Sequence, residues 1–251
     1  MLIEYIDQVA LERDSGKGRR GQSDLRNINY LVMEHWNELE EVLALYEGKP
    51  LVSDGESLEG YTEICSGCVA VAEESLKSLG HVRETGRLGR TFLHYASHLE
   101  GFDHKLNFLY SACGRMADTI YEHPRLKRDL LRLRLLVIRR LECGTGHELS
   151  IAEDVASEIR RLSMNIEHAD NGRLDLIEND GILRHDPVEW TARWEEIIDE
   201  ADRIVMEEAG DQAGRMGFCH LFWSLRRDVL QEKFGMQWRS PASTNPGVLF
   251  D

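Results

Sequence analysis

A seven-residue apolar repeat between Leu88 and His123 constrains the fold of this chain more than any other feature. The repeat consists of Phe92, Tyr95, Leu99, Phe102, Leu106, Leu109, Cys113, Met116 and Ile120. Its steps alternate between three and four, which places the apolar residues on one face of a helix. Gly101 and Gly114 fall off this face and need not interrupt it. We expect one helix, about 54 Å long at 1.5 Å per residue, as the central strut of a helical bundle.

Helical spacing of apolar residues also predicts shorter helices before and after this repeat. Only five prolines occur, and most stand where a helix should start or stop. Ser150 with Glu153 forms a capping-box pattern, and Asp186-Pro187 with Glu189 forms another start signal. The predicted helices cover residues 2–13, 24–47, 58–79, 125–142, 150–171, 187–208 and 213–234, and residues 15–23 are predicted to be a basic, Gly-rich loop.

The remaining segments complete the predicted architecture. Residues 173–185 are the one candidate for a short β-hairpin, with Asp180-Gly181 as its turn. The tail after Gly235 has no helical period, but its apolar residues favour a strap packed on the bundle; they are Trp238, Val248, Leu249 and Phe250. We predict a single all-α domain over residues 1–251, a bundle of about seven helices. A subdivision near residues 145–150 is the alternative.

Composition narrows the class of protein. The 251 residues carry a formal net charge of −15, which opposes general binding to nucleic acid or to an anionic membrane. No apolar run approaches the roughly 20 residues of a membrane-spanning helix, and the first residues lack the pattern of a secretory signal. Five cysteines without a regular framework suit a reducing compartment, so we expect a soluble, cytoplasmic protein.

Charge is unevenly distributed along the chain. Residues 125–140 hold seven basic residues and one acid, whereas residues 186–211 hold ten acids and two arginines. Arginine binds carboxylate or phosphate groups in a planar, bidentate geometry. The simpler interpretation is that acids of the same fold neutralise the basic helix; the alternatives are an anionic ligand and an acidic partner protein. The candidate anion-binding residues are Arg125, Arg128, Arg132 and Arg139.

Three patterns of metal-ligating residue types occur, each with a structural alternative. His94 and His98 are four residues apart, a spacing that can supply two metal ligands. Cys65 and Cys68 form a single CxxC inside a helical pattern, which favours cysteines that face the core. Two carboxylate rows lie opposite apolar stripes and are expected to face solvent, with a magnesium or di-metal site as the alternative; they are Glu34, Glu38 and Glu41, and Glu195, Asp199 and Asp202.

An Arg-x6-His spacing occurs twice, in Arg87 to His94 and in Arg161 to His168. All-α ribonucleases of the HEPN type use a similar spacing, but the polar residue usual after the arginine is replaced by leucine in both places. His94 and His168 are therefore the candidates for a catalytic acid or base.

The sequence thus favours a helical interaction or regulatory protein that acts by binding a protein, a second copy of itself or an anionic ligand. The alternative is a hydrolase of a phosphate-bearing substrate, HEPN-like or related to all-α nucleotide hydrolases, that uses the arginine-rich helix and a histidine. A metal-binding helical bundle is the third hypothesis. No pattern predicts an organic cofactor, and we expect none.

Overall fold

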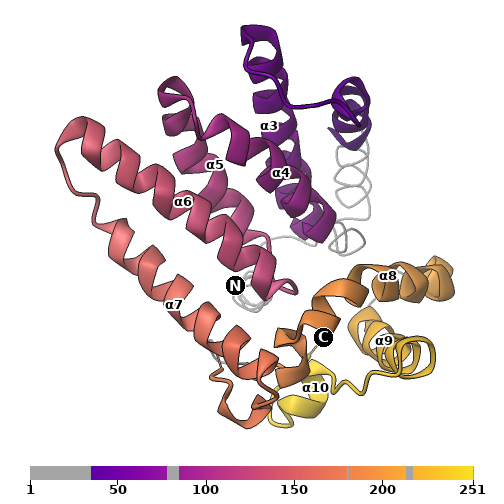
Figure 1. Ribbon diagram of the computed structural model, residues 1–251. Coiled ribbons are helices and arrows are strands. Elements are labelled where there is room, and N and C mark those ends of the chain that lie inside the picture. Colours follow the sequence, from indigo (N-terminus) through magenta and orange to yellow (C-terminus); the bar gives the residue numbers. More distant parts are fainter. Residues whose placement is uncertain (1–34, 78–84, 180, 182, 213–216, 251) are drawn as a thin grey trace, which may run out of the picture.

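The computed structural model describes residues 35–77, 85–179, 181, 183–212 and 217–250. Over this part of the chain the structure is helical and contains no β-strand, so the predicted all-α bundle is confirmed. After a helical stretch at 35–46, the α-helices shown in Figure 1 are α3 (Gly55–Lys77), α4 (Thr85–Leu99), α5 (Leu106–Asp118), α6 (Pro124–Thr145), α7 (Ile151–Asp170), α8 (Ala192–Ala209), α9 (Phe218–Phe234) and α10 (Pro241–Thr244).

Helices α3 to α7, which we call the main bundle, share one apolar core. Every member of the seven-residue repeat is buried except Phe102, which is partly buried and packs against the same core. Val137 of α6 and Val155 of α7 belong to one cluster, so this core continues across residues 145–150. The apolar repeat therefore identified the buried face of this part of the chain.

The repeat does not form one continuous helix, and the prediction of a long central strut is wrong. Helix α4 ends at Leu99, Phe102 has an extended backbone, and a short 3-10 turn (Asp103–Lys105) leads into α5. Glycine weakens a helix, and Gly101 lies at the break. The Arg140 side chain from α6 donates hydrogen bonds to the backbone carbonyl and the carboxylate of Glu100. Arg140 thus donates to acceptors that would otherwise lack a hydrogen-bond partner where the helix is interrupted.

Helices α8 and α9 and the tail, which we call the C-terminal unit, have a second apolar core. Trp194, Ile198 and Val205 of α8 pack with Leu230 of α9 and with Trp238 of the tail. Figure 1 shows α8, α9 and α10 gathered at one end of α6 and α7. Most of the buried apolar residues thus fall into two clusters, and the chain passes from one to the other after α7.

The tail packs on the protein as a strap for most of its length. Trp238 is buried, and its indole nitrogen donates a hydrogen bond to Glu189 (2.7 Å). The buried Asn245 amide donates to the backbone carbonyl of Arg184 (2.9 Å). The ring of Phe250 contacts that of Trp223, whereas Leu249 is 95% exposed and contributes nothing to the core. The predicted strap is therefore confirmed, apart from its expected contacts through Val248, which is 39% exposed, and Leu249.

The predicted hairpin at 173–185 is absent from the described residues of this segment. Residues Leu174–Leu176 form a 3-10 turn, and an extended stretch follows it. The buried Asn165 side chain both donates to the carbonyl of Glu178 (2.8 Å) and accepts from its N–H (3.0 Å). One side chain of α7 thus provides the hydrogen bonds that a second strand would have supplied.

Two helix starts differ in detail from their predictions. Asp186 caps a short 3-10 helix (Pro187–Trp190) rather than a long α-helix, and Thr191 then caps α8 by accepting from the N–H of Trp194 (3.2 Å). Ser150 precedes α7 as predicted, but its side chain makes no capping hydrogen bond, so the capping box is not formed.

Some predicted elements lie outside the described residues. They are the helix at 2–13, the basic loop at 15–23, the first part of the helix at 24–47 with Glu34, the ends at 78–79 and 213–216 of two other predicted helices, and Asp180 of the predicted turn. Among the helices that the structure describes, none has both the length and the apolar character needed to cross a membrane.

Candidate functional site

The outward face of α6 carries a stripe of basic and apolar side chains. Arg128, Arg132, Leu136, Arg139 and Cys143 follow one another at steps of three or four, so they share one face of the helix. Leu136 is 48% exposed, and the side chains of Arg132 and Arg139 are each 53% exposed. We call these five residues the α6 stripe. A half-exposed leucine between two exposed arginines gives this surface both apolar and cationic character.

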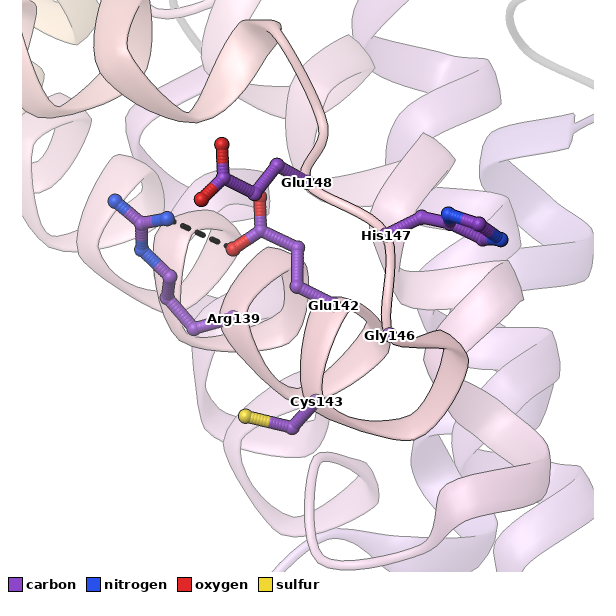
Figure 2. A pocket seen from close by; sticks show the side chains of 6 residues that line it. All are labelled: Arg139, Glu142, Cys143, Gly146, His147 and Glu148. Carbon is purple, nitrogen blue, oxygen red and sulfur yellow. Dashed lines mark hydrogen bonds and ion pairs between the residues drawn. The ribbon is translucent and has the colours of Figure 1, made fainter.

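The four arginines predicted to bind an anion all have carboxylate partners within the fold. Arg128 and Arg132 share Asp129, at 2.9 and 3.2 Å. Arg139 donates to Glu142 (2.8 Å), as Figure 2 also shows. Two guanidinium groups on one carboxylate leave the N-terminal part of the stripe with an excess of positive charge. The Arg132–Asp129 pair is exposed, and exposed ion pairs contribute about 0–1 kcal/mol, so a carboxylate from outside can replace this pair at small cost.

Arg125, at the start of α6, is held by groups of the neighbouring segments. Its guanidinium pairs with Asp170 at the end of α7 and donates to the backbone carbonyl of Trp190 (3.2 Å). The side chain is only 20% exposed. Of the predicted anion-binding set, Arg125 therefore joins α6 to α7 and to the segment before α8.

A shallow pocket of about 350 Å³ lies at the C-terminal end of α6 (Figure 2). It is lined by Arg139, Glu142, Cys143, Gly146, His147 and Glu148. Two carboxylates outnumber the one guanidinium, and the end of a helix carries a partial negative charge. Glu142 is also held internally, because it accepts the N–H of Leu149 (2.7 Å). The pocket therefore disfavours phosphate, although Arg139 and a histidine both line it.

The histidines predicted as metal ligands do not form a metal site within the described residues. His98 lies within hydrogen-bond distance of the Val52 carbonyl (3.1 Å), and its ring contacts that of Tyr61. His94 is exposed, and its ring contacts that of Tyr95. Across the described ranges, no three side chains of His, Cys, Asp or Glu are grouped as a metal ion would require.

The two Arg-x6-His pairs lie on different helices. Arg87 and His94 lie on α4, where Arg87 pairs with Glu40 (2.5 Å) and stacks on the ring of Trp36. Arg161 and His168 lie on α7, where Arg161 is 3.9 Å from Glu158. His94 and His168 remain candidates for a catalytic acid or base only because of their residue type.

The CxxC pair faces the core, as the spacing in a helical pattern indicated. Cys65 and Cys68 of α3 are fully buried. Burial raises the pKa of the Cys68 thiol to about 12 and that of Cys65 as well. Both thiols are therefore protonated at neutral pH and serve as small apolar side chains.

A dense group of charged side chains lies where the two cores meet, and sequence reasoning did not find it. We call it the junction cluster: Arg90 of α4, Glu122 and His123 before α6, Glu195, Asp199 and Asp202 of α8, and Arg226 of α9. The expectation that the α8 carboxylate row faces solvent is wrong. The Asp202 side chain is 3% exposed and that of Glu195 is 16% exposed, because this face of α8 packs on the main bundle.

One half of the junction cluster is centred on the buried His123. Its Nε2 lies 2.9 Å from Asp199 and its Nδ1 lies 3.3 Å from Glu195. Burial alone would lower the pKa of His123, but the two facing carboxylates raise it to about 9. The imidazole is therefore charged at neutral pH, and Arg90 pairs with Asp199 from the other side.

Glu195 also completes the start of α6. The side chain of the residue before this helix, His123, makes no capping bond. Glu195 instead accepts from the N–H groups of Arg125 (3.4 Å) and Leu126 (3.3 Å). A carboxylate at a helix N-terminus is stabilising, so α8 caps α6 from outside.

The other half of the cluster is centred on Arg226, which is 4% exposed. Its Nη1 and Nη2 donate to Glu122 (2.6 and 2.9 Å), and its Nε donates to Asp202 (2.7 Å). The guanidinium also stacks on the ring of Phe222 at 4.5 Å. The main bundle and both helices of the C-terminal unit thus share one buried arginine.

Gly86 of α4 leaves the space that the His123 ion pairs need. A β-carbon at this position would lie 2.4 Å from His123 Nε2 and 2.7 Å from Asp199 Oδ1. Replacing Gly86 with alanine should therefore push the pair apart and lower the free energy of unfolding by about 1–3 kcal/mol, measured by urea denaturation.

Gly144 of α6 provides the matched control, because a β-carbon there meets nothing within 4 Å. The Gly144→Ala variant should be as stable as the parent or more so, by up to about 1 kcal/mol. Equal stability of the two alanine variants would contradict the close approach at Gly86.

Comparison with known proteins adds no functional information. Neither the models of known protein families, nor curated proteins, nor solved structures give a match to this chain.

Proposed function

We propose that this protein acts by binding another protein through the α6 stripe, and that the surface it binds is acidic with an apolar contact. The observation that carries the proposal is the exposure of Leu136 between Arg132 and Arg139 on one helix face. Arginine is enriched at protein interfaces, and an apolar side chain at the centre of a charged patch adds burial to the charge contacts.

The stripe suits a protein partner better than a small phosphate. It runs along a convex helix surface, whereas small ligands are usually held in concave pockets. The pocket next to it has two carboxylates facing one arginine, which opposes phosphate binding. Arg128 and Arg132 already share Asp129, so an acidic partner would add the second carboxylate that this pair lacks.

A pull-down with the full-length purified chain tests the proposal. We expect the wild-type protein to retain a partner that the Arg132→Glu/Arg139→Glu variant loses, because charge reversal replaces attraction with repulsion. Titration of the identified partner should then give at least about a tenfold weaker Kd, which corresponds to 1.4 kcal/mol. Sedimentation of the chain alone covers the case in which the partner is a second copy.

Arg203→Glu is the matched control. Arg203 is as exposed as the two stripe residues and lies on α8, where it pairs with Glu200 and Glu207. Equal retention of the partner by all three proteins would contradict a role of the stripe. A thermal shift by sulfate or a nucleotide that the double variant loses would instead favour the phosphate-hydrolase alternative.

A further inference from the structure

Two carboxyl groups of the junction cluster are arranged so that they need a shared proton. Nη2 of Arg226 donates to both Glu122 and Asp202, so oxygens of the two carboxyl groups are neighbours on one nitrogen. Two ionised carboxylates this close repel each other, and a proton on one of them removes the repulsion.

The charges of the cluster lead to the same conclusion. The ion pairs that the structure describes here join three cationic side chains to four carboxyl groups. The cations are Arg90, His123 and Arg226, and the carboxyl groups are Glu122, Glu195, Asp199 and Asp202. The other three carboxyl groups are partly exposed, but the Asp202 side chain is only 3% exposed, so an unbalanced negative charge is most costly there. Asp202 is the most buried carboxyl group and is the site where the proton is held at least cost.

The position of the pair makes this proton important for the fold. Glu122 belongs to the main bundle, whereas Asp202 and Arg226 belong to the C-terminal unit, which has its own apolar core. If the pair lost this proton, the added negative charge would lie between the main bundle and the C-terminal unit. Separation of the two units would let water solvate this charge.

We propose that the C-terminal unit docks on the main bundle through one proton shared by Glu122 and Asp202, and that loss of this proton loosens the docking. The protein thereby contains a pH-sensitive junction between two helical units. This inference concerns the fold itself and does not depend on the binding proposed for the α6 stripe.

The direction of the pH dependence follows from the groups that face the pair. Burial raises the pKa of Asp202 to about 7 against the opposing charge of Arg226, and the Glu122 carboxylate adds to the rise. A carboxyl group whose pKa is raised on folding contributes stability at low pH that is lost as the pH rises to about 7. His123 acts in the same direction at higher pH, since its pKa is raised to about 9.

The remaining groups of the cluster affect stability only at acidic pH or lie against Arg226. Arg226 holds the pKa of Glu122 below its usual range although burial opposes this, and His123 and Arg90 do the same for Asp199. These two carboxylates lose their contribution to stability only as the pH falls to about 4 or below. Behind Arg226, Glu189 fixes Trp238, whose ring lies 5.5 Å from the guanidinium. We therefore expect the tightest docking in weakly acidic solution.

Hydrogen exchange of the full-length protein at about pH 5 and about pH 8 tests the proposal. Protection factors remove the intrinsic pH dependence of exchange and report local opening. We expect protection in α8 and α9 to fall at least about tenfold at the higher pH relative to α3 and α5; one pKa unit corresponds to this factor. Protection that is equal at both pH values would overturn the proposal.

The Asp202→Asn variant separates the shared proton from the other groups. Asparagine can donate to Glu122 and accept one of the two hydrogen bonds that Arg226 gives to Asp202, and it cannot ionise. We expect this variant to keep its protection up to about pH 7, with a remaining decrease only where His123 loses its proton. A variant that repeats the wild-type decrease between pH 5 and pH 7 would contradict the proposal.

Two further variants guard against a misfolded asparagine variant and a nonspecific charge effect. Glu122→Gln places a permanent hydrogen-bond donor at position 122 instead of position 202. It should also remove the decrease in protection between pH 5 and pH 7. Glu200→Gln changes an exposed acid of the same helix, which pairs with Arg203, and should keep the wild-type pH dependence. If Glu200→Gln removed the dependence as well, the net charge of α8 rather than the shared proton would be responsible.

Discussion

Replacing Arg226 with alanine is expected to lower the free energy of unfolding by about 3–5 kcal/mol. The substitution leaves Glu122 and Asp202 facing each other without the cation that binds both, and Asp202 is almost fully buried. Removing one partner of a buried ion pair is strongly destabilising because the other charge stays desolvated. Urea denaturation followed by circular dichroism at about pH 7 measures the loss.

Arg227 is the natural control for this experiment, since it is the next residue along α9. Its side chain is 57% exposed and pairs with Asp228 on the surface. Arg227→Ala should change stability by less than about 1 kcal/mol. The Arg226→Ala substitution should also cost less when Asp202 is already asparagine, because one buried charge is then gone. Similar losses for the two arginines would mean that the junction cluster does not stabilise the fold.

The apolar pattern predicted which side chains are buried better than where helices end. The repeat from Phe92 to Ile120 lies in the core although it is divided between α4 and α5. Periodicity reports a face, and two helices that pack on the same neighbours can share it. The break depends on Gly101 and on Arg140, which reaches the end of α4 from another helix. A contact 40 residues away in the sequence is invisible to a local pattern.

The arginine-rich helix was correctly recognised, but the junction cluster was missed. One signal for it was available in the sequence. Asp202 stands four residues after Ile198 and three before Val205, and Arg226 stands four residues before Leu230 and four after Phe222. Opposite charges placed among the apolar residues of two successive helices indicate a buried pair. No comparable pattern marks Glu122 and His123, because their role depends on how α8 packs across the start of α6.

The Trp194→Ala substitution is expected to cost about 3–5 kcal/mol of unfolding free energy. Trp194 is 1% exposed at the centre of the second core, and its ring lies 6.1 Å from that of Trp238. Its indole nitrogen also donates to the backbone carbonyl of Glu122 (2.9 Å), which belongs to the main bundle. The residue therefore acts both inside the C-terminal unit and across the junction, and urea denaturation measures the sum of the two effects.

Two further variants separate the packing of Trp194 from its hydrogen bond. Trp194→Phe keeps an aromatic ring but leaves the Glu122 carbonyl without its donor, so it should cost about 1–3 kcal/mol. Trp223→Ala removes a partly buried tryptophan of the same unit that packs against Phe250, and it should cost less than Trp194→Ala. If Trp223→Ala proved equally destabilising, packing within the C-terminal unit would explain the loss. Trp194→Phe can instead lower the protection of α8 and α9 from hydrogen exchange at about pH 5, where the wild-type junction is docked. In that case the hydrogen bond from the Trp194 indole contributes to the same docking contact as the buried charges.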